Sequence, residues 1–149
     1  VMLPPNTGAR LPARATVVVS LWYRTARAQQ DFPVGLPARP AALGLFLSAS
    51  PPAREARAID ASCGQTPAPD GDVFAIRPAV ARSQASIGVA IRPPGGPPRV
   101  LAWLREFDPA YQATYRLRDA VAMPSGTRID VVSPDAACHV YVQYTTARR

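Results

Sequence analysis

The sequence contains no lysine, a single histidine (His139) and only two cysteines (Cys63 and Cys138) among its 149 residues. One histidine excludes a metal site held by two histidines of this chain, and the two cysteines lack the C-x-x-C spacing of zinc and thiol-redox motifs. A glycine-rich phosphate loop and a G-x-S-x-G nucleophile motif are also missing. The sequence therefore has none of the motifs that identify these common classes of enzyme.

Long apolar runs are missing as well. No stretch approaches the ~20 apolar residues that a helix needs to cross a bilayer, so we expect no membrane span. The N-terminus lacks the charged, apolar and small-residue order of a signal peptide. Because the sequence starts at Val1, we expect it to be a fragment or a processed product, and residues before Val1 to supply a further domain in one interpretation.

The net charge of +7 comes entirely from arginine, because the chain has 17 arginines, 10 acidic residues and no lysine. Arginine suits carboxylate and phosphate contacts, which favours an anionic partner. The alternative, which we prefer, is coding bias, since a composition rich in Ala, Arg and Pro is typical of bacteria with GC-rich genomes. The arginines are scattered from Arg10 to Arg149 without runs or interleaved aromatics, so we expect no nucleic-acid binding.

Eighteen prolines and nine glycines divide the chain into short apolar stretches rich in Val, Ile and aromatic residues. This pattern predicts an all-β protein, an antiparallel β-sandwich of jelly-roll type with roughly nine strands. A proline-broken linker is expected at 24–40 and a loop at 64–71. The predicted strands are 16–23, 42–48, 56–63, 73–81, 86–91, 99–104, 111–117, 127–132 and 140–145.

A series of short motifs resembles, in order, the C-terminal half of the type II ascorbate-dependent copper monooxygenases, the family of peptidylglycine and dopamine hydroxylases and their bacterial relatives. The resemblance implies that 1–33 corresponds to the end of the first copper domain and 34–149 to the second. It also implies an extracytoplasmic or secreted location. The matching motifs include L-P-A at 11–13, T-V-V-V-S-L-W-Y at 16–23, V-F-A-I-R-P-A-V-A at 73–81, M-P-S-G-T-R-I-D-V at 123–131 and D-A-A-C-H-V-Y-V at 135–142.

The copper ligands of that family have no counterparts in this chain. In the family, two histidines and a methionine hold the copper at which oxygen reacts, and the resemblance places them at Ala79, Ala81 and Ala137. A histidine of the second copper corresponds to Trp22. Methyl groups offer no donor atom, and an indole offers no lone pair to a metal. We therefore expect no copper cofactor, no metal site and no catalytic residue.

Strand alternation predicts where the lost ligand positions lie. In the 73–81 strand, Phe74, Ile76 and Val80 share one face, whereas Arg77, Ala79 and Ala81 share the other. In the last strand, Cys138, Val140, Val142 and Tyr144 form the apolar side, opposite Ala137, His139, Tyr141 and Gln143. We expect Trp22, Ala79, Ala81 and Ala137 to share one open surface. The candidate binding face consists of Trp22, Arg77, His139 and Tyr141.

The two cysteines allow two interpretations. The resemblance implies that each once paired with another cysteine, and one of those partner positions is now Val132. Cys63 and Cys138 either pair with each other or remain as two buried free thiols. A bridge that closes ~75 residues would stabilise the fold by about 4 kcal/mol in the chain-entropy description.

Three hypotheses on function remain. The first, which we prefer, is a non-catalytic β-sandwich module that binds a protein partner or an adjacent domain, or stabilises a larger assembly. The second is a domain of a copper monooxygenase whose metal is held by another chain or domain. The third is a protein that binds a small apolar or anionic ligand with Trp22 and Arg77.

Overall fold

The computed structural model describes residues 3–18, 44–79, 85–108, 113–134 and 138–147. The chain forms two compact units. The first comprises Val1–Arg10 and Pro51–Arg149, and the second comprises Leu11–Ser50. The division at residue 33 that the family resemblance implies stays a prediction.

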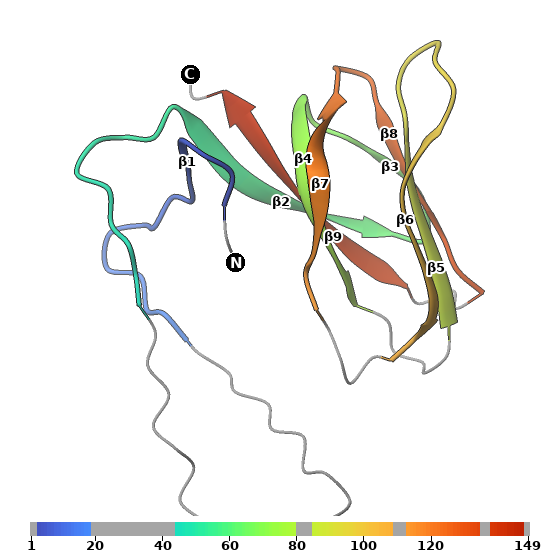
Figure 1. Cartoon of the computed structure of the whole chain (residues 1–149), viewed down its shortest axis with the longest axis horizontal. Coiled ribbons are helices and arrows are strands. Elements are labelled where there is room, and N and C mark those ends of the chain that lie inside the picture. The colour runs from blue at the N-terminus through green and yellow to red at the C-terminus, as the bar shows by residue number, and fades with distance from the viewer. Residues whose placement is uncertain (1–2, 19–43, 80–84, 109–112, 135–137, 148–149) are drawn as a thin grey trace, which may run out of the picture. The chain divides into compact units, whose positions relative to one another are not determined.

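Nine strands and no helix occur among the described residues, and the predicted all-β class is confirmed. Every strand belongs to the first unit (Figure 1). The strands are β1 (Thr7–Gly8), β2 (Arg54–Ser62), β3 (Gly64–Pro67), β4 (Gly71–Ala79), β5 (Ala85–Arg92), β6 (Arg99–Phe107), β7 (Tyr115–Met123), β8 (Arg128–Val132) and β9 (His139–Ala147).

The strands form two sheets with the connectivity of a jelly roll. Sheet A has the order β1-β2-β9-β4-β7, and sheet B has the order β3-β8-β5-β6. All neighbours are antiparallel except β1 and β2. Without the two-residue β1, eight strands remain, four in each sheet, and this is the predicted jelly-roll type (Figure 1).

The core lies between the two sheets, and β5, β8 and β9 each contribute alternate residues to it. This alternation follows from the pleat, which points successive side chains to opposite faces. The last strand shows it as predicted, because Cys138, Val140, Val142 and Tyr144 are all buried. The other buried members of the core are Ala61, Val73, Ile76, Ile87, Val89, Ile91, Phe107, Val121, Met123, Ile129 and Val131.

A β-bulge at Phe74 changes the predicted faces of β4. The pairing of β4 with both β7 and β9 shifts register between Val73 and Ala75. Because of this extra residue, Val73 and Ile76 belong to the core cluster, whereas Phe74 is buried outside it. The prediction that Phe74 shares a face with Ile76 was therefore wrong. Beyond the bulge, Arg77 is exposed, as predicted.

Two segments differ from the sequence prediction in their secondary structure. The predicted 64–71 loop begins with β3 (Gly64–Pro67), a short edge strand that, among the described strands, pairs only with β8. Pro67 lies at its last position, where an edge strand tolerates a proline. The strand expected at 111–117 runs instead from Tyr115 to Met123.

The predicted strands at 16–23 and 42–48 are wrong where the structure describes them. Residues 16–18 and 44–48 form no strand. Their apolar side chains face solvent, with Val18 80% and Phe46 103% exposed. An apolar stretch becomes a strand only when a neighbouring strand pairs with its backbone, and the described part of the chain supplies none here. The remaining residues of both predictions, and the 24–40 linker, lie outside the described ranges.

Candidate functional site

The outer face of sheet A, turned away from the core, carries the candidate site. The register of β2, β9 and β4 places Asp60, Tyr141 and Arg77 in one row across three neighbouring strands. The next row consists of Ser62, His139 and Ala79. Residues adjacent to these along each strand point into the core, so both rows point outward.

Four of these side chains interact and form what we call the outer cluster: Asp60, Arg77, His139 and Tyr141. The Nδ1 atom of His139 lies 3.2 Å from Oδ1 of Asp60, and both side chains are 50% exposed. The guanidinium carbon of Arg77 lies 4.6 Å from the centroid of the Tyr141 ring. A cation–π contact at an exposed site contributes about 0.5–1 kcal/mol, so these contacts orient the side chains and leave them accessible.

Three of the four predicted binding-face residues meet in this cluster. Arg77, His139 and Tyr141 lie together, whereas Trp22 falls outside the described residues. Asp60 was missed from the sequence. The signal was present, because Asp60 lies between Ile59 and Ala61, which pack on the core, and alternation therefore turns it outward.

The described residues do not fit the copper site that the family resemblance implies. Of the four lost ligand positions only Ala79 is described, and its methyl group lies directly opposite His139 on β9. Ala81, Ala137 and Trp22 lie outside the described ranges. Within those ranges, no three His, Cys, Asp or Glu side chains are grouped closely enough to hold a metal ion. Among the residues that the structure describes, Asp60 and His139 thus form a pair of donors without a third.

A disulfide between Cys63 and Cys138 lies next to the outer cluster. It joins the end of β2 to the start of β9, with the two Cα atoms 5.4 Å apart. The N–H of Cys63 also donates a hydrogen bond of 3.1 Å to the carbonyl oxygen of Cys138. The structure therefore confirms the interpretation in which Cys63 and Cys138 pair with each other. It fastens together the two strands that carry Asp60 and His139.

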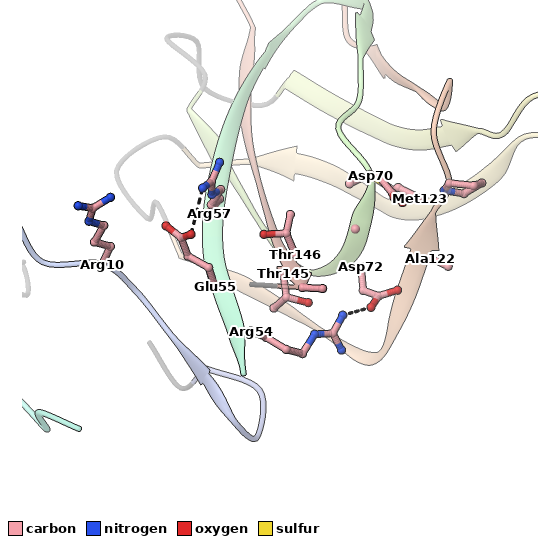
Figure 2. A pocket seen from close by; sticks show the side chains of 13 residues that line it. Arg10, Arg54, Glu55, Arg57, Asp70, Asp72, Ala122, Met123, Thr145 and Thr146 are labelled. Carbon is pink, nitrogen blue, oxygen red and sulfur yellow. Dashed lines mark hydrogen bonds and ion pairs between the residues drawn. The ribbon is translucent and has the colours of Figure 1, made fainter. Parts of the chain in front are cut away.

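A second polar region lies at the opposite end of sheet A. A pocket of about 1110 Å³ opens there, and Figure 2 shows its charged lining. Arg54 forms an ion pair with Asp72, and Nη2 of Arg57 lies 3.0 Å from Oε2 of Glu55. The hydrogen bond from Arg57 and the negative charge of Glu55 raise the pKa of the Arg57 guanidinium.

The charges that line this pocket balance one another. Arg10 and Asp70 also contribute to the lining, which therefore contains three arginines and three carboxylates. Two ion pairs neutralise most of this charge within the protein, and a ligand of either sign gains little electrostatic attraction. The pocket therefore gives weaker support for a function than the outer cluster.

Comparisons with models of known protein families, with curated proteins and with solved structures find no match to this chain. The described residues include no helix of the length and apolar character that a membrane span requires.

Proposed function

We propose that the chain is a non-catalytic β-sandwich module that binds a partner polypeptide, either another protein or an adjacent domain, through the outer cluster on sheet A. The observation that carries this proposal is the arrangement of Asp60, Arg77, His139 and Tyr141. They come from three neighbouring strands, are in contact in two pairs, and remain accessible to solvent.

The composition of the outer cluster supports binding. Tyr and Arg are enriched among the residues that contribute most to protein interfaces. Arg77 rests against the Tyr141 ring, which orients its guanidinium for hydrogen bonds to carboxylates or carbonyl oxygens of a partner. Because all four residues lie on strands, little side-chain and backbone freedom is lost when a partner binds.

The same residues give less support for catalysis. Ser62 stands opposite His139 in the register of β2 and β9, and Asp60 contacts the imidazole. A nucleophilic serine needs a hydrogen bond to its base. None of the hydrogen bonds among the described residues joins Ser62 to His139. The small-ligand hypothesis depends on Trp22 and gains no support from the described residues.

Photo-crosslinking in the cells that produce the protein tests this proposal. We would replace Tyr141 with p-benzoylphenylalanine and irradiate, with the same replacement at Ser125, in the turn between β7 and β8, as the control. We expect a discrete adduct with one partner polypeptide from position 141 and none from position 125. Adding Arg77→Glu should reduce the adduct about tenfold, as expected for the loss of an important interface residue.

Either of two results would refute the proposal. One is the absence of any polypeptide adduct at position 141. The other is the same adduct, in similar yield, from position 125, which would show that the crosslinker samples passing proteins. Thermal unfolding of each variant must match the parent, so that a lost adduct reports on the surface and not on the fold.

A further inference from the structure

The outer face of sheet B carries an apolar patch that the outer cluster on sheet A does not involve. Val100 and Trp103 on β6 are 66% and 58% exposed, and Val132 on β8 is 62% exposed. The register places Trp103 and Val132 on either side of Gly88, in one row across β6, β5 and β8. We call Val100, Trp103 and Val132 the sheet B patch.

Gly88 determines how Trp103 lies. A Cβ atom at position 88 would stand only 2.6 Å from Cζ3 of the indole, so the ring covers the glycine. A glycine within a strand often marks a place where another group approaches the backbone closely. The indole is thus held against β5, while more than half of Trp103 remains open to solvent.

Arginines surround the sheet B patch, and few of them are neutralised. Arg105 follows Trp103 by two residues on β6, and Arg99 begins that strand. Within the described part of the chain, no carboxylate pairs with either of them. Arg128 on β8 donates a 3.0 Å hydrogen bond to Oε1 of Gln65, a neutral group. Of the arginines around the patch, only Arg92 has an ion-pair partner among the described residues, Asp130, at 3.0 Å.

The patch also adjoins an open sheet edge. β6 is the last strand of sheet B and, among the described strands, pairs only with β5. Alternate residues among its nine therefore direct N–H and C=O groups to a side on which no described strand pairs with them. Natural proteins protect such an edge with charge, and here Arg99 begins the strand, while Arg105 lies near its end and is followed by Glu106 and Asp108. An extended acidic segment complements both the backbone groups and the arginines.

We propose that the sheet B patch and the free edge of β6 dock an extended, acidic segment of another polypeptide. The segment pairs with β6, places an apolar side chain beside Trp103, and directs a carboxylate at Arg105 on the same face of the strand. A second copy of this chain is a poorer occupant, because it brings a further net charge of +7 and the same arginines. This inference involves the other sheet and does not depend on the function proposed for the outer cluster.

Tryptophan fluorescence provides the test. In a Trp22→Phe variant, Trp103 is the only indole. The probe is a nine-residue peptide with valine at position 5, glutamate at positions 1, 3, 7 and 9 and threonine elsewhere, so that valine and glutamate share one face of a strand. Its ends are acetylated and amidated, and the control has lysine in place of each glutamate. We expect the acidic peptide to shift the emission to the blue in a saturable manner, and the affinity to fall as salt screens the arginines. The basic peptide should cause no shift.

Two arginine variants distinguish a direct contact at the sheet B patch from a general effect of net charge. Arg105→Glu should weaken binding about tenfold, whereas Arg118→Glu on β7 of sheet A makes the same change in net charge and should leave the affinity unchanged. Two further peptides carry N-methyl groups on alternate amides, one peptide along each edge of the strand. Only one of them should lose binding, because only one edge of the peptide faces β6.

The proposal is overturned if the acidic peptide produces no shift, if the basic peptide binds equally well, or if Arg105→Glu and Arg118→Glu have the same effect. Vesicles of phosphatidylserine and phosphatidylcholine separate a lipid surface from a polypeptide. A shift with these vesicles and none with the acidic peptide would show that the patch binds an anionic membrane instead. Thermal unfolding of both glutamate variants checks that each remains folded.

Discussion

Removal of the Cys63–Cys138 disulfide should lower the stability of the sandwich by a predictable amount. The bridge joins residues 75 positions apart. In the chain-entropy description, closing a loop of this length stabilises the folded state by about 4.5 kcal/mol at 25 °C. Domains of this kind have a total stability of about 5–15 kcal/mol, so the bridge supplies a large share. For a chain near 150 residues, the expected fall in melting temperature is roughly 10–18 °C.

Urea unfolding of the oxidised and fully reduced protein measures this difference without changing a side chain. Cys63→Ala with Cys138→Ala should reproduce the loss, with a small addition because Cys138 is only 1% exposed and its sulfur fills space in the core. The stability of this double variant must not depend on reductant. Two titratable thiols in the untreated protein, or equal stability of the oxidised and reduced forms, would refute the reasoning.

Two further substitutions test the register of sheet A and its close packing. Ala79→His places an imidazole opposite His139, with the Cβ atoms about 5 Å apart. The affinity for copper(II), measured by calorimetry, should rise about tenfold or more and fall back when His139→Ala is added. An unchanged affinity would contradict the register. Gly71→Ala should cost about 1–3 kcal/mol in urea unfolding, because the new Cβ overlaps the carbonyl oxygen of Thr145. Gly44→Ala, with open space around it, is the matched control, and equal losses would contradict this account.

Local alternation was enough to predict much of the fold. Val140 and Val142 are fully buried on β9, as their spacing indicated, because a side-chain period of two can be read directly from the sequence. The turn between β7 and β8 also has a local signal, because the M-P-S-G motif at 123–126 combines a proline with a glycine. Its geometry rests on local groups, since the N–H of Thr127 donates a 3.1 Å hydrogen bond to the carbonyl oxygen of Pro124.

Features that depend on distant partners were not predictable. β3 (Gly64–Pro67) is polar and ends in a proline, and it forms a strand only because β8 lies beside it. The apolar residues 44–48 have the composition of a strand, yet the described part of the chain pairs none with them. The bulge at Phe74 arises from pairing with β7 and β9, which no local pattern reveals.

The candidate site shows the same limit. The alternation of β9 indicated that His139 and Tyr141 share a face, and the alternation of β4 added Arg77. Asp60 belongs to a strand that is distant in the sequence, and only the register of β2 with β9 brings it to His139. The identity of a cluster's members could therefore be predicted within each strand but not between strands.

Elemental analysis of the purified protein after equilibration with cuprous and cupric salts, combined with oxygen uptake in the presence of ascorbate, tests most directly the proposal that the chain is a non-catalytic module. Because Ala79 offers no donor atom and, among the described residues at this site, only Asp60 and His139 do, we predict substoichiometric copper and no ascorbate-dependent oxygen uptake above that of the same concentration of free copper. Stoichiometric copper together with ascorbate-dependent hydroxylation of an added substrate would contradict the claim.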